Sequence, residues 1–405
     1  MKQRIVVTGL GVISSIGIGW RAFWDSLLAG RSGISKISYV DTADYPAQFG
    51  GEVKHFDPLE FMPADEARRL GRGAQMAIAA TKLAIEDAQW SKESFAQLRT
   101  GICLGTTMAD IQALESANAA WVQNGERHIR GAWVRQYPSC TMSAHVARHF
   151  KLNGPNLMIP NACAAGNYAI GYAYDLLRLG KAEVMVAGGV DPFSRIAFMG
   201  FNRIFAIAPE KCQPFDKNRQ GTLIGEGAGV LILEPLERAQ ARGAPIYAEV
   251  LGYGLSCDAH HMTIPDVDGL TRVMERALED AEISPDDVNY ISAHGTGTPA
   301  NDKAECAAIH NVFEDRARTI PVSSIKSMLG HTMGAASALE AVACCLAVSK
   351  GEIPPTINYN TRDEECNVDC VANSSRAQQV LKAVSNSFAF GGNNACVVFS
   401  EPTHP

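Results

Sequence analysis

The segment that most constrains the fold is a nearly all-apolar run, Ala182-Glu-Val-Met-Val-Ala-Gly-Gly-Val190. Such a run is typical of a strand that is buried on both faces and therefore needs helices on either side. Strand-like segments alternate with helical periodicity along most of the chain. We predict strands at 4–13, 101–105, 182–190, 225–234, 246–253, 288–292, 320–324 and 384–399, and helices at 20–29, 73–89, 268–281, 301–313 and 333–349. This alternation predicts an α/β layered fold.

The chain is too long for one ordinary hydrophobic core. Its 405 residues predict two domains or two fused halves, which we place at 1–240 and 241–405. The similar order of elements on either side of the charged segment 235–245 indicates an internal duplication, although no sequence-level repeat is visible. One region, 118–140, is polar and turn-rich and carries no assigned element.

Composition excludes several classes of protein. With 46% hydrophobic and 20% charged residues, the chain is typical of a soluble globular enzyme. A net charge of −7 argues against general nucleic-acid binding, but it is compatible with a local basic patch for an acidic partner. No apolar run approaches the roughly 20 residues that cross a bilayer, and no signal peptide is recognisable. The eleven cysteines have no CxxC spacing, which predicts a reduced, cytoplasmic protein.

One cysteine lies where a strand is expected to turn into a helix. The apolar end of a strand at Asn156-Leu-Met-Ile is followed by Cys163, two alanines and a glycine, and then by amphipathic periodicity. A thiol at this turn faces the unpaired N–H groups of the first helical turn, whose partial positive charge is expected to lower its pKa. The same N–H groups can donate to an oxyanion that forms at the sulfur. These features favour a nucleophile over a structural thiol.

Two histidines are also predicted to lie at the ends of elements. His294 follows a strand in Ile291-Ser-Ala-His-Gly-Thr-Gly-Thr-Pro299, and His331 precedes an alanine-rich helix in Ser324-Ile-Lys-Ser-Met-Leu-Gly-His-Thr-Met-Gly334. Either histidine alone is more typical of a structural role. Together with a cysteine at a strand end, they indicate a nucleophile with imidazole partners.

Two other kinds of site are rejected. The Gly9-Leu-Gly11 segment resembles part of a dinucleotide fingerprint, but position 14 is serine where the third glycine belongs, so NAD is not predicted. His145 and His149 have the spacing of one helix face, and Cys366 and Cys370 lie in a polar loop. Neither pair is a sufficient zinc signal, and no metal is predicted.

Taken together, these motifs make the chain similar to a β-ketoacyl-acyl-carrier-protein synthase of the elongating type II group. The resemblance runs from Val6-Val-Thr-Gly-Leu-Gly11 to Phe388-Ala-Phe-Gly-Gly-Asn-Asn394 and includes the Cys163, His294 and His331 motifs. It implies a thiolase-like fold with five layers, αβαβα, formed by two duplicated halves. The first half would carry the nucleophilic cysteine and the second half both histidines.

The resemblance also implies the catalytic roles. Cys163 would accept an acyl group from the phosphopantetheine of acyl carrier protein, with the N–H groups of Cys163 and Phe390 as the oxyanion hole. His294 and His331 would bind the malonyl thioester carbonyl and promote loss of CO2, for which the rings must stay neutral. Lys326 would orient the site electrostatically, and Glu340, which we group with the substrate-binding residues, would pair with it.

Further contacts follow from the same resemblance. Thr296 and Thr298 would hydrogen-bond the pantetheine arm, and Met108 and Trp133 would shape the acyl pocket. The basic candidates for binding the acidic carrier protein are Arg68, Arg69, Arg72, Arg127, Arg130 and Lys211. The expected partners are the carrier protein and a second subunit, in a homodimer or in a heterodimer with a related chain. No cofactor is expected, because the substrates are carried on phosphopantetheine.

Two departures from the family pattern point to a specialised pathway, such as polyketide, polyene or modified-lipid synthesis, rather than housekeeping fatty-acid elongation. Ala164-Ala165 replaces the common Ser or Thr after the cysteine. Ala389 replaces a glycine before Phe390, which is expected to restrict movement of the phenylalanine. Two alternatives remain open. A non-catalytic chain-length partner would lack the nucleophile, and a degradative thiolase would carry a second cysteine in the terminal glycine loop, whereas Cys396 lies beyond it.

Overall fold

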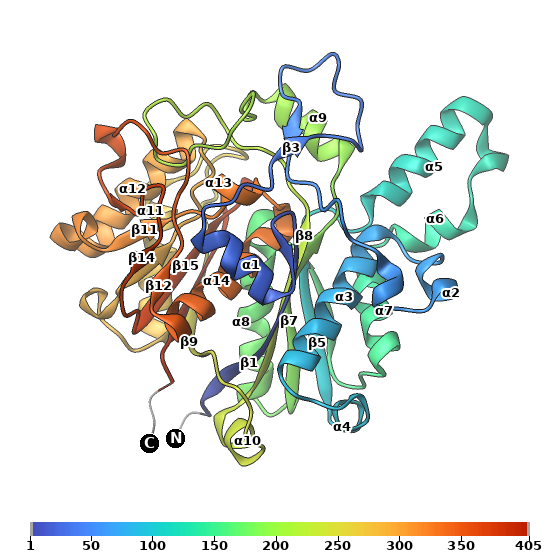
Figure 1. Ribbon diagram of the computed structural model, residues 1–405, viewed down its shortest axis with the longest axis horizontal. Coiled ribbons are helices and arrows are strands. Elements are labelled where there is room, and N and C mark those ends of the chain that lie inside the picture. The colour runs from blue at the N-terminus through green and yellow to red at the C-terminus, as the bar shows by residue number, and fades with distance from the viewer. Residues whose placement is uncertain (1–2, 403–405) are drawn as a thin grey trace.

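A computed structural model of the chain describes residues 3–402, and its main sheet consists of two halves with the same strand order (Figure 1). In the first half the neighbouring strands are β1 (Ile5–Ser14), β8 (Gly227–Pro235), β7 (Val184–Asp191), β5 (Thr100–Thr106) and β6 (Asn156–Pro160). In the second they are β9 (Ala248–Cys257), β16 (Asn393–Ser400), β15 (Lys382–Phe388), β10 (Tyr290–Ser292) and β11 (Pro321–Ser323), with β13 (Asp369–Cys370) beside β11. By chain order, both sets run first, fifth, fourth, second, third. The duplication is therefore confirmed by topology.

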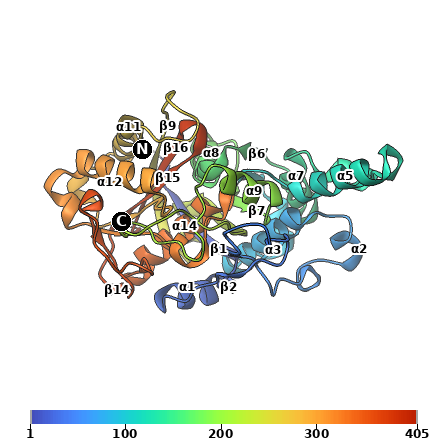
Figure 2. The same ribbon diagram turned by 90° about the horizontal axis from the view of Figure 1, so that it is seen from above.

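Helices cover both half-sheets on both faces, in the predicted five-layer arrangement. The outer layer of the first half contains α3 (Arg72–Asp87) and α7 (Cys140–Phe150), the central layer contains α8 (Ala165–Arg178) and α14 (Ala336–Lys350), and the outer layer of the second half contains α11 (Val267–Asp280) and α12 (Pro299–Phe313). Seen from above, α8 and α14 lie between the two outer pairs (Figure 2). The two half-sheets also meet directly, because the start of β1 pairs with β9.

The all-apolar strands are explained by burial on both faces. On β7, Val184 and Val186 belong to the outer core with α3, whereas Met185 and Ala187 belong to the central core with α8 and α14. Successive side chains of a strand point to opposite faces, so both faces of this strand need apolar residues. The strand prediction at 182–190 is confirmed in type and nearly in length.

The strand predicted at 4–13 is confirmed as β1, which runs through the glycines of the partial dinucleotide fingerprint to Ser14 without a turn. Its glycines serve packing instead, and a Cβ atom on Gly11 would lie 1.8 Å from the Ala80 carbonyl oxygen of α3. The region 118–140 is largely helical, with α5 (Ile111–Asn124) and α6 (Gly131–Gln136) forming an arm that projects from the body (Figure 1). Periodicity did not reveal the arm, because many of its apolar side chains face solvent rather than a core.

The remaining elements are short and surround these layers. The helices are α1 (Trp20–Leu28), α2 (Ala64–Ala67), α4 (Lys92–Gln97), α9 (Arg195–Arg203), α10 (Leu236–Ala241) and α13 (Lys326–Leu329), and the strands are β2 (Gly17–Ile18), β3 (Ser35–Lys36), β4 (Phe49–Gly50), β12 (Glu352–Ile353) and β14 (Arg376–Ala377). The prediction that no apolar run approaches spanning length was wrong, because within residues 3–402 one helical stretch, 333–350, is long and apolar enough to cross a membrane by length and composition. In the fold, 89% of that stretch is buried as a core helix, so it is weak evidence for a membrane segment.

The close approach of α3 to β1 makes Gly11 a sensitive position. We expect Gly11→Ala to lower the free energy of unfolding by about 3 kcal/mol, because the new methyl group meets helix backbone that cannot yield. Gly200→Ala is the matched control, since its Cβ would meet nothing within 4 Å on α9 and should stabilise the helix by about 0.5–1 kcal/mol. Denaturant unfolding of both variants measures the difference. Equal stabilities would contradict this account of the packing.

Candidate active site

Cys163 lies in the predicted turn between a strand and a helix. It is the middle residue of a single 3-10 turn, Ala162–Ala164, between β6 and the start of α8, and its exposed fraction is 5%. Ala162, immediately before it, has a φ of 49°, in the left-handed region that side chains rarely adopt. The turn aims the sulfur at the backbone N–H groups of Cys163 and Phe390, both of which act to lower the thiol pKa.

The expected lowering of the cysteine pKa does not occur. Burial raises the pKa of Cys163 to about 12, although the charge of Lys326 and the two backbone N–H groups act in the opposite direction. The free-energy cost of removing the thiolate from water exceeds the stabilisation that the helix terminus and Lys326 provide. The resting nucleophile is therefore a thiol, and its proton has to leave as the sulfur reacts.

The two predicted histidines lie together in the buried site. His294 follows β10, and His331 lies between α13 and the 3-10 turn Met333–Ala335. Their ring centroids are 5.5 Å apart with the planes nearly perpendicular, and both residues are at most 2% exposed. The prediction that two loops distant in sequence form one imidazole pair is confirmed by this geometry.

Hydrogen bonds orient both rings in the same sense. The Met333 backbone N–H donates to Nδ1 of His331 at 3.2 Å. The Lys326 ammonium lies 3.4 Å from Nδ1 of His294 and donates to the His294 carbonyl oxygen at 2.6 Å. Because each Nδ1 faces a donor, the neutral ring carries its proton on Nε2. Both imidazoles can therefore donate an Nε2–H to an acceptor.

The electrostatics keep both rings uncharged. Burial, followed by the nearby Lys326 ammonium, lowers the pKa of His294 and of His331 well below the usual 6.5. Lys326 is 1% exposed and forms a hydrogen-bonded ion pair with Glu340 of α14. Burial raises the pKa of Glu340 to about 7, although the lysine opposes this shift. The prediction that Lys326 is buried and pairs with Glu340 is confirmed.

A cavity connects the three reactive side chains. Its lining includes Cys163, His294 and His331, the hydroxyl residues Thr296 and Thr298, and Phe390. A loop with three polar and three apolar side chains lines another part of the cavity, at Asp258, His261, Met262, Thr263, Ile264 and Pro265. The Phe390 ring stacks on Phe201 with centroids 5.4 Å apart and is 37% exposed. One side of the cavity is therefore formed by the aromatic rings of Phe201 and Phe390, and another carries the hydroxyl groups of Thr296 and Thr298.

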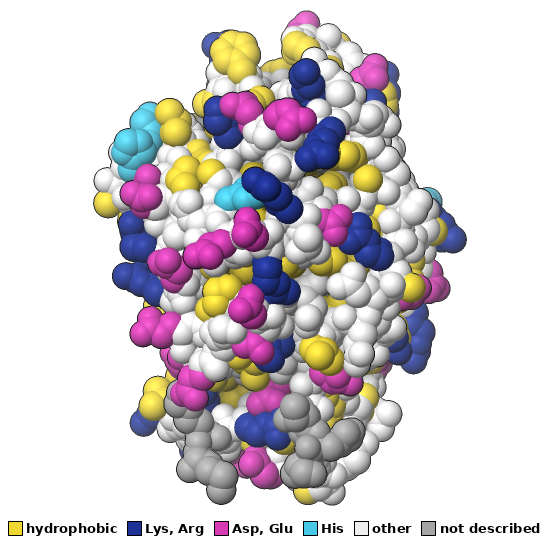
Figure 3. Space-filling view, turned by 90° about the vertical axis from the view of Figure 1, so that its left-hand side faces the viewer, with side chains coloured by type: hydrophobic (Ala, Val, Ile, Leu, Met, Phe, Trp, Pro, Cys, Tyr) yellow, Lys and Arg dark blue, Asp and Glu magenta, His cyan; other side chains and the backbone are white. Residues whose placement is uncertain are grey.

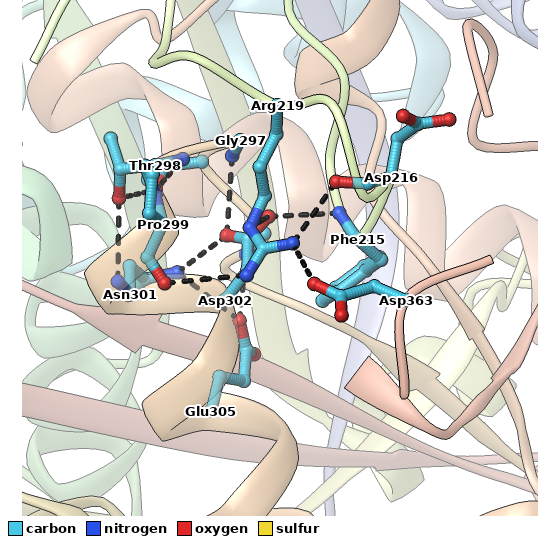
Figure 4. Close-up of polar contacts among 12 residues, drawn as sticks. Phe215, Asp216, Arg219, Gly297, Thr298, Pro299, Asn301, Asp302, Glu305 and Asp363 are labelled. Carbon is cyan, nitrogen blue, oxygen red and sulfur yellow. Dashed lines mark hydrogen bonds and ion pairs between the residues drawn. The ribbon is translucent and has the colours of Figure 1, made fainter. Parts of the chain in front are cut away.

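A buried ionic network supports the loop that carries His294 (Figure 4). The Glu305 carboxylate accepts the backbone N–H groups of His294 and Gly295 at 2.8 and 2.7 Å. The Asp302 carboxylate accepts the N–H of Gly297 at 3.2 Å and forms an ion pair with Arg219 at 3.8 Å. Sequence reasoning missed Arg219, Asp302 and Glu305. The one available signal was the three-residue spacing of two acidic residues at the start of a helix after the Thr296–Pro299 motif.

Two predicted pocket residues do not line this cavity. Met108 belongs to a neighbouring apolar cluster with Phe198, Phe201 and Met333. Trp133 lies on α6 of the projecting arm, where the Arg130 guanidinium sits 5.2 Å from its ring centroid. The single chain therefore does not bring Trp133 to Cys163, because the arm extends away from the site (Figure 1).

The six basic residues predicted to bind the carrier protein differ in their exposure to solvent. Arg68, Arg69, Arg127, Arg130 and Lys211 are exposed. Arg72 is a correction, because its guanidinium donates to the buried Glu226 carboxylate at 2.7 and 2.8 Å and to the Val53 carbonyl oxygen at 2.7 Å. On the face that carries α11 and α12, acidic and basic side chains are interspersed (Figure 3).

Other reactive side chains lie apart from the cavity. Cys396 is fully buried in the outer core of the second half, where burial raises its thiol pKa. His149 of α7 contacts Glu66 at 2.9 Å. Among the described residues, no group of three or more His, Cys, Asp or Glu side chains could hold a metal ion. No disulfide joins the cysteines in this part of the chain.

Comparisons with known proteins agree with this geometry. The family described as "Beta-ketoacyl synthase, N-terminal domain" matches residues 2–239, and "Beta-ketoacyl synthase, C-terminal domain" matches residues 247–360. A Synechocystis protein named 3-oxoacyl-acyl-carrier-protein synthase 2 is 40% identical over 409 residues, covering 99% of this chain and 98% of that protein. A Staphylococcus aureus protein of the same name is 38% identical over 408 residues, covering 99% of each.

Solved structures show the same likeness. A structure titled "The ishigamide ketosynthase/chain length factor" matches with a TM-score of 0.95 and 42% identity over the whole of both chains. A type II polyketide synthase ketosynthase, solved with its acyl carrier protein, matches with a TM-score of 0.91 and 33% identity, again over the whole of both chains.

The neutrality of the two imidazoles can be measured directly. In the folded protein, we expect the ring nitrogens of His294 and His331 to keep the shifts of neutral Nε2–H tautomers from pH 8 down to pH 6, because burial and Lys326 lower both pKa values. In the unfolded chain they should titrate near 6.5. Nitrogen-15 NMR of the imidazoles, assigned with His294→Ala and His331→Ala, provides the measurement. Protonation of either ring above pH 6.5 in the folded state would contradict the electrostatic account.

Proposed function

The chain belongs to the β-ketoacyl synthase family, and we propose that it is a 3-oxoacyl-acyl-carrier-protein synthase, an acyltransferase that extends a thioester-bound chain by two carbons. The observation that carries the proposal is the shared cavity of one cysteine and two neutral imidazoles that present Nε2–H groups. Such a set can hold an acyl group on sulfur and polarise a second thioester beside it.

The first half-reaction is transfer of the acyl group to Cys163. The sulfur attacks the thioester carbonyl, the carbon–sulfur bond to the pantetheine breaks, and the thiol proton passes to the departing pantetheine sulfur. The N–H groups of Cys163 and Phe390 lie close enough to the sulfur to stabilise the oxyanion that forms. Exchange of one thioester for another needs no oxidant and no metal.

The second half-reaction is decarboxylative condensation. The Nε2–H groups of His294 and His331 donate to the malonyl thioester carbonyl, so that loss of CO2 leaves a stabilised enolate. The enolate carbon attacks the acyl–Cys163 carbonyl, and the carbon–sulfur bond to Cys163 breaks to give the 3-oxoacyl product. The departing thiolate takes a proton from water, which restores the resting thiol. Neutral rings suit this step, because they donate a proton to a hydrogen bond without surrendering it.

Lys326 and Phe390 take supporting roles. The Lys326–Glu340 ion pair, with the lysine bond to the His294 carbonyl, holds that loop and keeps both imidazoles neutral. Phe390 is placed to act as a gate, because Gly391 and Gly392 after it have φ values of 82° and 72° that glycine adopts freely. Ala389 has a φ of −115°, which any residue adopts, so its Cβ causes no strain in this conformation.

The partners that we propose are acyl carrier protein and a second subunit. Thr296 and Thr298, whose hydroxyls are 2.9 Å apart on the cavity wall, would receive the pantetheine arm. The exposed Arg68 and Arg69, which follow α2, and the exposed arginines of the arm would meet the acidic carrier. The edge strand β6 and the exposed apolar residues of the arm, including Trp121 and Val122, support a dimer. Only in such an assembly would Trp133 reach an acyl pocket. The unpaired cysteines support a cytoplasmic location.

For the pathway, we propose specialised synthesis over housekeeping elongation. Support comes from Ala164 and Ala165, both fully buried behind the nucleophile, and from the 42% identity to a ketosynthase/chain-length-factor structure. Because that structure includes a chain length factor, a non-catalytic partner role is the second candidate. Retention of Cys163 in its cavity favours catalysis.

Single substitutions should separate the two half-reactions. Cys163→Ala should abolish formation of the acyl-enzyme, whereas His294→Ala and His331→Ala should each lower CO2 release from malonyl carrier by about 100-fold or more, as expected for loss of a donor to a developing oxyanion. Intact-mass spectrometry and CO2 detection measure the two steps. Cys140→Ala and His128→Ala, both exposed positions, serve as controls. Acyl-enzyme in Cys163→Ala would overturn the nucleophile assignment, and a wild-type protein that never acylates would favour the non-catalytic partner.

The acyl range tests the pathway proposal. We expect the wild-type protein to load and extend a restricted set of acyl carriers, with at least about a tenfold preference over saturated chains of housekeeping length, which corresponds to about 1.4 kcal/mol. Competition among acyl carriers of different length and unsaturation, read by intact mass, gives the profile. Comparable condensation rates across the whole saturated series would show housekeeping elongation instead.

A further inference from the structure

Asp191 is a buried carboxylate that joins three segments around the site. It ends β7, is 1% exposed, and accepts four hydrogen bonds. One oxygen accepts the Thr106 hydroxyl at 2.6 Å and the Met108 N–H at 3.1 Å. The other accepts the Thr107 N–H at 2.7 Å and the Gly334 N–H at 2.6 Å. A fully satisfied buried carboxylate of this kind fixes the relative positions of its donors.

The bond to Gly334 acts on His331 through the adjacent residue. Met333, whose N–H orients the His331 ring, has a left-handed φ of 55° and is followed directly by Gly334. The turn is tightly packed, because a Cβ atom on Gly334 would lie 2.5 Å from the backbone of Thr106 and Thr107. Asp191 therefore holds the turn that aims one imidazole, as Glu305 holds the loop of the other.

The same carboxylate holds the turn after β5 through both of its oxygens. This turn carries Met108, which shares an apolar cluster with Met333 and Phe201, and Phe201 stacks on the Phe390 ring. The carboxylate thus links the turn that carries Met108 to the turn that orients His331.

We propose that Asp191 is a positioning residue that fixes the His331 turn against the Thr106–Met108 turn and is required for decarboxylation but not for acylation of Cys163. The inference rests on the proposed function. A purely structural role would impair both half-reactions together. The role proposed for Asp191 is different, because its charge also raises the pKa of Cys163. Loss of that charge favours the thiolate, which is the form of Cys163 that attacks the thioester. The two half-reactions should therefore respond differently to its removal.

Two substitutions separate the hydrogen bonds from the charge. Asp191→Ala removes both. Asp191→Asn removes the charge, but its amide oxygen can still accept from Thr107 and Gly334, while its NH2 group can donate to the Thr106 hydroxyl and loses only the bond from the Met108 N–H. Asp87 of α3 gives the matched control, because its half-buried carboxylate also joins separate segments, accepting the Leu10 N–H at 2.9 Å, the Trp20 Nε1–H at 2.7 Å and the Tyr247 hydroxyl at 3.0 Å, and none of these residues lines the cavity.

The experiment compares CO2 release from malonyl carrier, acyl-enzyme formation by intact mass, and thermal stability. Asp191→Ala should lower CO2 release by about 10- to 100-fold, as expected for a displaced catalytic group, with acyl-enzyme formation undiminished. Asp191→Asn should recover part of the lost CO2 release, to within severalfold of the wild-type rate. Asp87→Ala and Asp87→Asn should lower the melting temperature and leave the ratio of the two rates at the wild-type value.

Equal losses of both half-reactions in the Asp191 variants, or a wild-type ratio, would overturn the inference. Asp191→Asn preserves the side-chain volume, so it keeps the test available should Asp191→Ala not fold. In Asp191→Asn the ratio of CO2 release to acyl-enzyme formation should still fall severalfold. A wild-type protein without either half-reaction would instead refute the proposed function. In that case nitrogen-15 NMR decides the inference alone, because Asp191→Ala should weaken the Met333 hydrogen bond to His331 Nδ1, and an unchanged Nδ1 shift would refute it.

Discussion

The buried ammonium of Lys326 is the interaction on which the site depends. A cation removed from water is costly unless it is paired and hydrogen-bonded, and Lys326 satisfies both conditions through Glu340 and the His294 carbonyl oxygen. The same charge makes protonation of His294 and His331 unfavourable and partly offsets the desolvation of Cys163. One charge thus biases all three reactive groups, and it can do so only because the surrounding layers exclude water.

The duplicated fold explains why these groups meet. The two central helices, α8 and α14, follow equivalent strands in their halves and pack closely. A Cβ atom on Gly166 would lie 2.7 Å from the Ala338 nitrogen. Each helix is preceded by a 3-10 turn with a left-handed non-glycine residue, Ala162 in one half and Met333 in the other. The nucleophile and the turn that orients His331 therefore arise from the same structural position in the two halves.

Carboxylates outside the cavity fix the positions of the loops and turns around the two histidines. Glu305 and Asp302 hold the His294 loop, and Asp191 holds the turn after His331, each through backbone N–H groups rather than through the reactive side chains. Backbone acceptors of this kind position a loop without presenting a competing group to the substrate. Burial raises the pKa of Glu305 to about 7 and of Asp191 to about 6. The charged forms are therefore destabilised by desolvation, and the hydrogen bonds from the loops offset part of that cost.

The sequence by itself determined the layered α/β class, the turn that carries Cys163 and the two histidine loops, because these depend on local signals of apolar periodicity, small residues and strand ends. The pKa of Cys163, the partners of Arg72, the helical arm at 111–136 and the roles of Glu305 and Asp191 were decided only by the tertiary structure. Desolvation and hydrogen bonding between segments far apart in the chain depend on which groups are brought together and sealed from water. A residue's neighbours in sequence do not contain that information.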